Sequence, residues 1–391
     1  MGPLEGIKVL DMSFYAPARV ASMFFGDFGA DVIGIEMRRA DRPSSTKILD
    51  DDLHYRWLTY QRNKKSITLN LKTEEGKNIF YRLAEKADVI LESFQPGTAK
   101  KLGVDYESVK KVNPEIVYCS ISGFGQDGPY AHLIANEPSY QGIGGVLALT
   151  GPRKGPPVIS AALVGDIGGG AYPAMIGVLS ALLWKKETGK GQYIDIGIAP
   201  AVLAMSRVLP HIYWQRGNEL PPRGEILVAG GGPNLTTYQT KDGEYVVVSC
   251  LEPWLWERLC RALGKENLIP LFRATGKERD KVFAELSEVF ALKTRDEWAE
   301  WNMKENVSVT PVLDLPEVLT DPHMLHRKMV VELDYPPIGK IKQIGIPIKL
   351  SETPGEVKWM PRYGEHTEEI LTELGYKKDD CRGLRERGVI E

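Results

Sequence analysis

Short apolar runs alternate with amphipathic stretches through the first third of the chain. The runs have the length of buried strands, and the stretches between them carry apolar residues at helical spacing. In one stretch Ile79, Phe80 and Leu83 share a face, and we expect that helix to begin near Thr73. This alternation predicts a mostly parallel, doubly wound, Rossmann-like α/β domain. The expected strands cover residues 7–10, 31–35, 66–69, 89–91, 116–120 and 193–198.

The pattern changes after residue 214. Two short runs, 236–240 and 245–249, flank Asp242-Gly243, a common hairpin turn, and charged amphipathic helices follow from Trp254 to about Met303. Two later strands are expected at 329–333 and 346–350. We therefore predict a large domain over 1–214, a smaller α+β domain over 215–325, and a segment over 326–391 that returns to the large domain.

The longest apolar stretch is interrupted by glycines. Gly165-Asp166 precedes Gly168-Gly169-Gly170, and a helix is expected from Ala171. Glycines leave backbone amides accessible, and a helix N-terminus attracts anions. Asp166 is then either an ordinary helix N-cap or a carboxylate at the mouth of an anion-favouring pocket. The stretch alone favours the cap.

Composition excludes several classes of protein. With 391 residues, 43% of them apolar, the chain can bury a large core. A formal charge of −3 gives no general reason to bind nucleic acid or an anionic membrane. The first strand is not followed by the glycine fingerprint of dinucleotide-binding proteins. Arg38 and Arg39 directly follow strand 31–35, where open α/β sheets bind ligands, and arginine suits phosphate.

The four cysteines are scattered, without metal-ligand spacing, so we expect no metal site and a reducing compartment. The N-terminus does not read as a signal peptide, and the apolar run that ends at Trp184 looks too short to span a bilayer. These observations predict a cytoplasmic protein.

Seven short motifs, taken in their order along the chain, indicate a protein family. They are LEGIKVLD at 4–11, GDFGADVI at 26–33, RNKKSI at 62–67, ADVILESF at 87–94, CSISGFG at 119–125, TGKGQ at 188–192 and GEHT at 364–367. Together they resemble the class III CoA-transferase family, which includes formyl-CoA transferases, carnitine CoA-transferases and 2-methylacyl-CoA racemases. The resemblance covers essentially the whole length.

The resemblance implies a coenzyme A thioester as substrate, a carboxylic acid as the second substrate, and no further cofactor. It also implies that Asp166 is the nucleophile. A carboxylate can attack a thioester to give a mixed anhydride, and the CoA thiolate then returns to form an aspartyl-CoA thioester. The amides of Gly168 and Gly169 are the expected donors to the oxyanion.

Other positions carry over from the family. Arg38 and Arg39 are expected to bind the CoA nucleotide. Gly230, Gly231 and Gly232 resemble a loop that closes over the intermediates and excludes water. Tyr140 matches an active-site position, but Gln141 replaces the acid of the oxalate-using branch. The family also implies a homodimer of two interlocked rings, with a heteromer as the alternative.

Two alternatives remain beside the transferase. Racemases of the family pair the aspartate with a histidine, and here that position is Asn136, although Glu252 matches their supporting glutamate. An amide cannot exchange a proton at neutral pH, so the sequence favours the transferase over an epimerase using Asp166 and Glu252. The other alternative is a silent subunit of a heteromeric transferase. The acyl substrate is not readable, although five aromatic residues hint at a bulky pocket: Trp57, Tyr60, Tyr140, Tyr172 and Trp214.

Overall fold

The computed structural model describes residues 2–42 and 54–391, and it divides the chain into two compact units. The first unit comprises Met1–Gly144, Ala161–Met205 and Pro322–Glu391. The second comprises Gly145–Ser160 and Ser206–Asp321. It begins earlier than the predicted small domain and takes in a segment, 145–160, that the sequence assigned to the large one. Each unit is described by itself.

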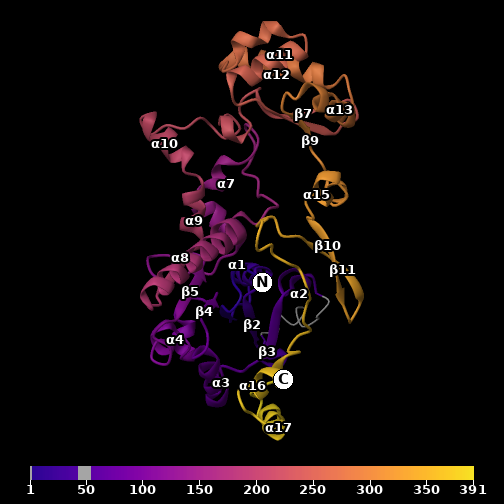
Figure 1. Ribbon diagram of the computed structural model, residues 1–391. Helices are drawn as coiled ribbons and strands as arrows, with labels where there is room; N and C mark the ends of the chain where they lie inside the picture. The colour runs from indigo at the N-terminus through magenta and orange to yellow at the C-terminus, as the bar shows by residue number, and fades with distance from the viewer. Residues whose placement is uncertain (1, 43–53) are drawn as a thin grey trace. The chain divides into compact units, whose positions relative to one another are not determined.

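A parallel sheet forms the centre of the first unit (Figure 1). Its six strands lie in the order β3-β2-β1-β4-β5-β6, which is the order of a doubly wound Rossmann sheet. The predicted α/β class and the parallel sheet are therefore confirmed. The strands are β1 (Lys8–Asp11), β2 (Asp31–Glu36), β3 (Lys64–Thr68), β4 (Val89–Glu92), β5 (Val117–Ser122) and β6 (Tyr193–Gly197).

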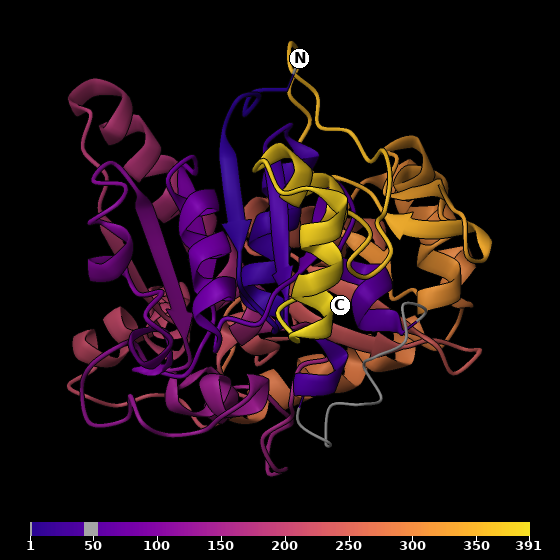
Figure 2. The same cartoon turned by 90° about the horizontal axis from the view of Figure 1, so that it is seen from below.

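Helices cover both faces of this sheet. On one face α3 (Glu74–Ala84), α16 (Thr367–Glu373) and α17 (Lys378–Glu386) share a core with side chains from β1 to β5. Figure 2 shows the C-terminal helices, in yellow, beside the indigo strands of the sheet. The other face receives α1 (Ala16–Asp27) and α8 (Tyr172–Thr188), whose buried residues lie outside that core. Burial on both faces explains why the strands read as continuous apolar runs.

Shorter elements complete the first unit. They are η1 (Arg39–Asp41), α2 (Tyr55–Tyr60), α4 (Thr98–Leu102), α5 (Tyr106–Val109), α6 (Glu137–Ile143), η3 (Val164–Ala171), α9 (Ile198–Met205), α15 (Pro322–His326), β10 (Val330–Tyr335) and β11 (Gly339–Ile344).

A buried ion pair ties the C-terminal segment to the first unit. Arg62 and Asp27 form a two-pronged contact, with Nε–Oδ1 and Nη2–Oδ2 distances of 3.0 and 2.7 Å, and Asn63 donates to the same carboxylate. Arg62 also donates to the carbonyl of Ile344, and Asn63 pairs with the backbone of Glu356 and Lys358. The RNKKSI motif thus holds the returning segment.

The last predicted strand is wrong. The chain pairs β10 with β11 in an antiparallel hairpin, whereas residues 346–350 form no strand. Pro347 cannot donate a ladder hydrogen bond, which disfavours a strand at that point. The segment Gly339–Ile344 has no proline and contains the polar–apolar–polar run Lys340-Ile341-Lys342, so it was the better strand signal.

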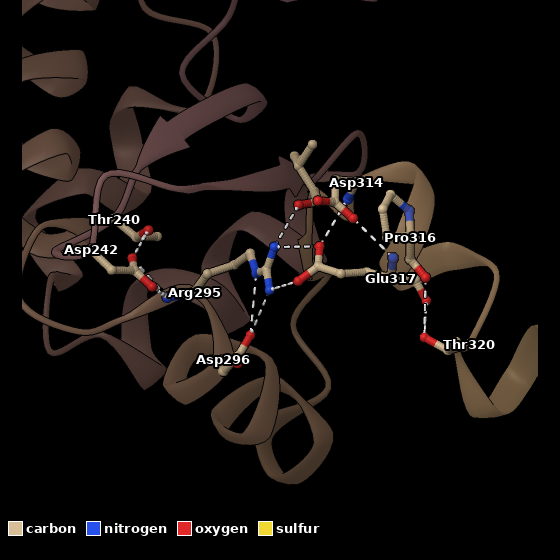
Figure 3. A network of polar contacts seen from close by, with 9 residues as sticks. Thr240, Asp242, Arg295, Asp296, Asp314, Pro316, Glu317 and Thr320 are labelled. Carbon is tan, nitrogen blue, oxygen red and sulfur yellow. Dashed lines mark hydrogen bonds and ion pairs between the residues drawn. The ribbon is translucent and has the colours of Figure 1, made fainter.

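The second unit holds a small antiparallel sheet, in the order β7-β8-β9, packed against helices. Figure 3 shows how Arg295 joins its parts: the guanidinium donates to both oxygens of Glu317 and to the carbonyl of Val312, while the backbone amide donates to Asp242. The elements are α7 (Val146–Leu149), α10 (Val208–Gln215), η4 (Leu227–Ala229), β7 (Leu235–Gln239), β8 (Tyr245–Ser249), α11 (Pro253–Ala262), η5 (Glu266–Leu271), α12 (Gly276–Phe290), α13 (Arg295–Glu305), β9 (Val309–Pro311) and α14 (Leu315–Val318).

The central apolar helix is longer than the sequence indicated. Within the described residues, Val164–Thr188 is one continuous segment that is long and apolar enough to cross a membrane by length and composition. The expectation that this run is too short is therefore wrong. In the fold its buried face is made of small residues and methionine, whereas Ile176 and Leu183 are 66% and 67% exposed.

Candidate active site

Asp166 lies within a helix rather than in a turn before one. The α-helix α8 begins at Tyr172, within one residue of the predicted start at Ala171. The glycine-rich turn expected before it is instead a π-helix, η3 (Val164–Ala171), which runs directly into α8. Glycine is needed there for close packing. A Cβ on Gly169 would lie 2.8 Å from the carbonyl oxygen of Ile198, and one on Gly170 would lie 2.8 Å from Cβ of Pro17. Short π-helices are frequent at functional sites.

The amides around Asp166 already have acceptors. Those of Ile167 and Gly168 donate to the carbonyl of Leu163, at 2.8 and 3.4 Å. Those of Gly165 and Asp166 donate to Glu137, at 2.8 and 2.5 Å. Neither Gly168 nor Gly169 lines a cavity described below. The structure therefore does not bring the expected glycine donors to the site.

Glu137, at the start of α6, caps the helix that carries Asp166. Its Oε1 accepts from the Gly165 amide, its Oε2 from the Asp166 amide, and the Gln141 side chain donates to Oε1 at 2.7 Å. Gln141 is only 2% exposed. Gln141 thus orients Glu137 and does not itself line either cavity at Asp166.

Burial and a like charge raise the proton affinity of Asp166. Burial, followed by the charge of Glu137, raises the pKa of Asp166 to about 6, while Arg56 opposes the shift. Burial, followed by the charges of Asp166 and Glu137, raises the pKa of Tyr140 to about 12. The Tyr140 hydroxyl therefore stays neutral and donates to the carbonyl of Ala135 at 2.7 Å.

Two cavities meet at Asp166. The first, of about 350 Å³, is lined by residues that include Phe94, Ile121 and Phe124, and no arginine or lysine of the described residues lines it. The second, of about 490 Å³, is aromatic and cationic. Three residues line both: Tyr15, Asn136 and Asp166. A reactant with two arms could therefore place one arm in each cavity and its reactive carbon at Asp166.

A third, smaller cavity of about 80 Å³ lies at the carboxyl ends of β1, β2 and β3. Arg38 and Arg39 come from the adjoining segment. Arg38 makes a two-pronged contact with Asp41, a lining residue, at 2.6 and 2.9 Å. The guanidinium of Arg39 lies 4.2 Å from the ring centre of Tyr363. The structure thus places both arginines at the carboxyl edge of the sheet, where they contact side chains of the protein.

The remaining candidates divide between the units. Gly230, Gly231, Gly232, Glu252 and Trp214 belong to the second unit. Tyr140, Trp57 and Tyr60 line the cavities at Asp166, whereas Tyr172 does not. Sequence reasoning missed the roles of Glu137 and Arg56.

No group of three or more His, Cys, Asp or Glu residues suited to a metal occurs in the described part of the chain.

We expect transfer to depend on pH through Asp166. The family resemblance implies that Asp166 is a nucleophile that attacks an acyl-CoA, and a nucleophilic carboxylate must be ionised. On that expectation, kcat/KM for an acyl-CoA donor should rise with pH and level off above about 6. Glu137→Gln removes a negative neighbour and should move this acid limb to lower pH. The measurement is a pH–rate profile of both proteins. An unchanged limb in Glu137→Gln would contradict the assignment to Asp166 beside Glu137.

The sequence matches CoA-transferase family III over residues 4–367. It is 34% identical over 425 residues to a formyl-CoA:oxalate CoA-transferase from Streptomyces coelicolor, and 32% identical over 417 residues to one from Escherichia coli O157:H7. Each alignment covers 99% of both chains. The fold resembles a CaiB/BaiF family protein from Brucella suis, with a TM-score of 0.80, 29% identity, and coverage of 95% of this chain and 99% of the other.

Proposed function

The chain belongs to CoA-transferase family III, and from that premise we propose that it moves CoA from an acyl-CoA to a carboxylic acid through a covalent intermediate on Asp166. The observation that carries the proposal is the position of Asp166. It is half-buried where two chemically different cavities meet, and it carries a raised pKa. A more basic carboxylate is a better nucleophile once it is ionised.

Four displacements complete the reaction. The Asp166 carboxylate attacks the thioester carbon, CoA thiolate leaves, and a mixed anhydride forms. The thiolate attacks the aspartyl carbonyl, so the first acid leaves and an aspartyl-CoA thioester remains. The acceptor carboxylate attacks that thioester and again expels thiolate. The thiolate finally attacks the acceptor carbonyl, which yields the new acyl-CoA and frees Asp166.

Other residues assist these steps in the proposal. Asn136 lines both cavities and can donate from its side-chain amide to the oxyanion. Arg38 and Arg39 follow the carboxyl end of β2, and in the proposal they bind the CoA nucleotide, as the family resemblance implies. The loop Gly230–Gly232 excludes water from the anhydride, as the family resemblance implies. The scheme uses CoA and its thioesters as substrates and requires no further cofactor.

The racemase is the weaker reading. Among the described residues that line the two cavities there is no histidine, and the only carboxylates are Asp166 and Glu137. Both oxygens of Glu137 already accept hydrogen bonds, and the amide of Asn136 cannot act as a general acid or base at neutral pH. A silent subunit is also disfavoured, because Asp166 keeps the surroundings of a nucleophile.

We expect a cytoplasmic homodimer. The exposed apolar side chains of α8 include Ile176, Leu183 and Trp184, and a second copy of the chain would cover them.

One purified sample tests the proposal. The chain alone should sediment as a dimer and should exchange labelled acids into acyl-CoA thioesters without a second subunit. A chain that sediments as a monomer while active would contradict the dimer. A chain that transfers no CoA between any donor and acid, unless a paralogous subunit is added, would contradict the proposed function.

A further inference from the structure

The larger cavity at Asp166 combines positive charge with aromatic walls. Its lining includes three arginines, whereas the described lining of the smaller cavity contains no arginine or lysine. Its aromatic lining residues are Phe14, Tyr15, Tyr55, Trp57 and Tyr60. In a thioester that reacts at Asp166, the acyl part and the CoA part extend in different directions from the reacting carbon. Two cavities of different chemistry can therefore each hold a different part of the substrate.

Two of the three arginines are committed to the protein. Arg19 donates to Glu36 at 2.6 Å and to the carbonyl of Ser13 at 3.1 Å, and it is buried. Arg42 is also buried, and its guanidinium lies 4.8 Å from the ring centre of Tyr363. Both guanidinium groups are therefore held by the protein and are not free to move into the open part of the cavity to bind a ligand.

Arg56 differs from both. It is exposed, and its one side-chain hydrogen bond to the described residues runs from Nε to the Tyr55 hydroxyl at 3.3 Å. No carboxylate of the described residues makes an ion pair with it. The charge of Arg56 also acts on Asp166. It lowers the pKa of the Asp166 carboxyl, but by less than burial and the charge of Glu137 raise it. Its terminal nitrogens therefore remain available to an anion in the cavity.

A guanidinium in this setting matches a particular ligand chemistry. Its donors can bind both oxygens of a carboxylate at once. Aromatic walls bind hydrocarbon and need apolar surface on the ligand. A cavity of about 490 Å³ leaves room for a carbon chain between the reacting carbonyl and Arg56.

We propose that the acid transferred by this protein carries a second carboxylate, which Arg56 binds across the larger cavity while the aromatic walls contact a carbon spacer. The inference rests on the proposed transferase function. It defines the substrate as a dicarboxylic acid longer than oxalate, because oxalate has two directly joined carboxyl groups and no apolar surface for the walls.

The test compares matched acceptor acids with one acyl-CoA donor. Succinate and glutarate are paired with butyrate and valerate, in which a methyl group replaces the second carboxylate, and oxalate is a separate arm. All assays run at pH 8, so that loss of Arg56 does not change the ionisation of Asp166. The variants are Arg56→Gln and Arg56→Lys, with Arg382→Gln, an exposed arginine of α17, as the control.

The readout is the ratio of kcat/KM for each dicarboxylate to that for its monocarboxylate partner. We expect the unmodified protein and Arg382→Gln to favour succinate or glutarate over both the monocarboxylates and oxalate. Arg56→Gln should lower the ratio roughly 10- to 100-fold, the usual effect of losing a charged hydrogen-bonded pair, and Arg56→Lys should lower it less.

Three outcomes overturn the inference, and they differ in meaning. Equal use of mono- and dicarboxylates, with a ratio unchanged in Arg56→Gln, means that Arg56 acts on Asp166 alone, and the transferase function stands. A preference for oxalate over the longer acids would reject the proposal that the aromatic walls contact a carbon spacer between the two carboxylates. Absence of transfer to every acid rejects the proposed function and this inference with it.

Discussion

Asp166→Asn should lose CoA transfer by about a thousandfold or more, the scale seen when a covalent nucleophile is removed. The amide keeps the size of the carboxylate but cannot form the anhydride. The hydrogen bonds of the Asp166 backbone amide to Glu137 do not depend on the side chain, so the helix should persist. The measurement is steady-state transfer, with Asp127→Asn, an exposed aspartate outside both cavities, as the control.

The same variant should be at least as stable as the unmodified protein above pH 6. The folded protein raises the pKa of Asp166 from 3.8 to about 6, so folding disfavours the ionised carboxylate. This cost to folding is complete above about pH 6 and disappears below about pH 4. The amide of the variant removes it, so at pH 8 the free energy of unfolding should be about 1 to 3 kcal/mol higher in the variant. Denaturant unfolding at pH 8 and pH 4 checks this. Near-normal transfer, or a large loss of stability at pH 8, would contradict the assigned role.

A 2-methylacyl-CoA should keep its configuration when incubated with the protein. Inversion requires a proton to leave one face of the α-carbon and another to arrive on the opposite face. Asp166 supplies one base, but Asn136 supplies none, and Glu137 is held by two backbone amides and by Gln141. We therefore expect inversion in deuterated water to be at least about a thousandfold slower than transfer, the usual contribution of a missing acid–base group.

The control is the rate of deuterium uptake in Asp166→Asn. Slow exchange on one face, dependent on Asp166 and without inversion, agrees with a carboxylate close to the α-carbon. Deuterium uptake with loss of optical purity at the rate of transfer would make Asp166 a general base and the protein an epimerase.

The sheet was predictable because its strands are buried on both faces. Continuous apolar runs such as 89–91 leave little choice of secondary structure, and the order of strands and helices then fixes a parallel sheet. The hairpin at 236–249 followed from Asp242-Gly243 for a similar local reason. Local signals sufficed wherever the local preference and the tertiary environment agree.

The glycine-rich segment shows where local reasoning failed. Three glycines predict a turn, because glycine disfavours helices. In the fold the same residues allow the helix to approach Ile198 and Pro17 more closely than any side chain would permit, so tertiary packing overrides the propensity. The buried residues of α8 are Ala174, Met175, Val178 and Ala181, whereas the larger Ile176 and Leu183 are exposed.

Asp166 itself was identified from the sequence, but its neighbours were not. Glu137 precedes it by 29 residues, and nothing in the local pattern around Glu137 indicates that its carboxylate caps the helix of Asp166. Arg56 lies in a polar, basic stretch and could not be told from a solvated arginine. Both roles depend on how distant segments meet in the first unit.

The covalent step can be observed directly. The protein is incubated with an acyl-CoA donor and no acceptor, trapped with hydroxylamine, digested and analysed by mass spectrometry. We predict a hydroxamate at Asp166 that forms only with the donor, reaches a substantial fraction of the protein, and is absent from Asp166→Asn. A donor-dependent adduct on another residue, or full transfer activity with Asp166 unmodified throughout turnover, would contradict the aspartyl mechanism.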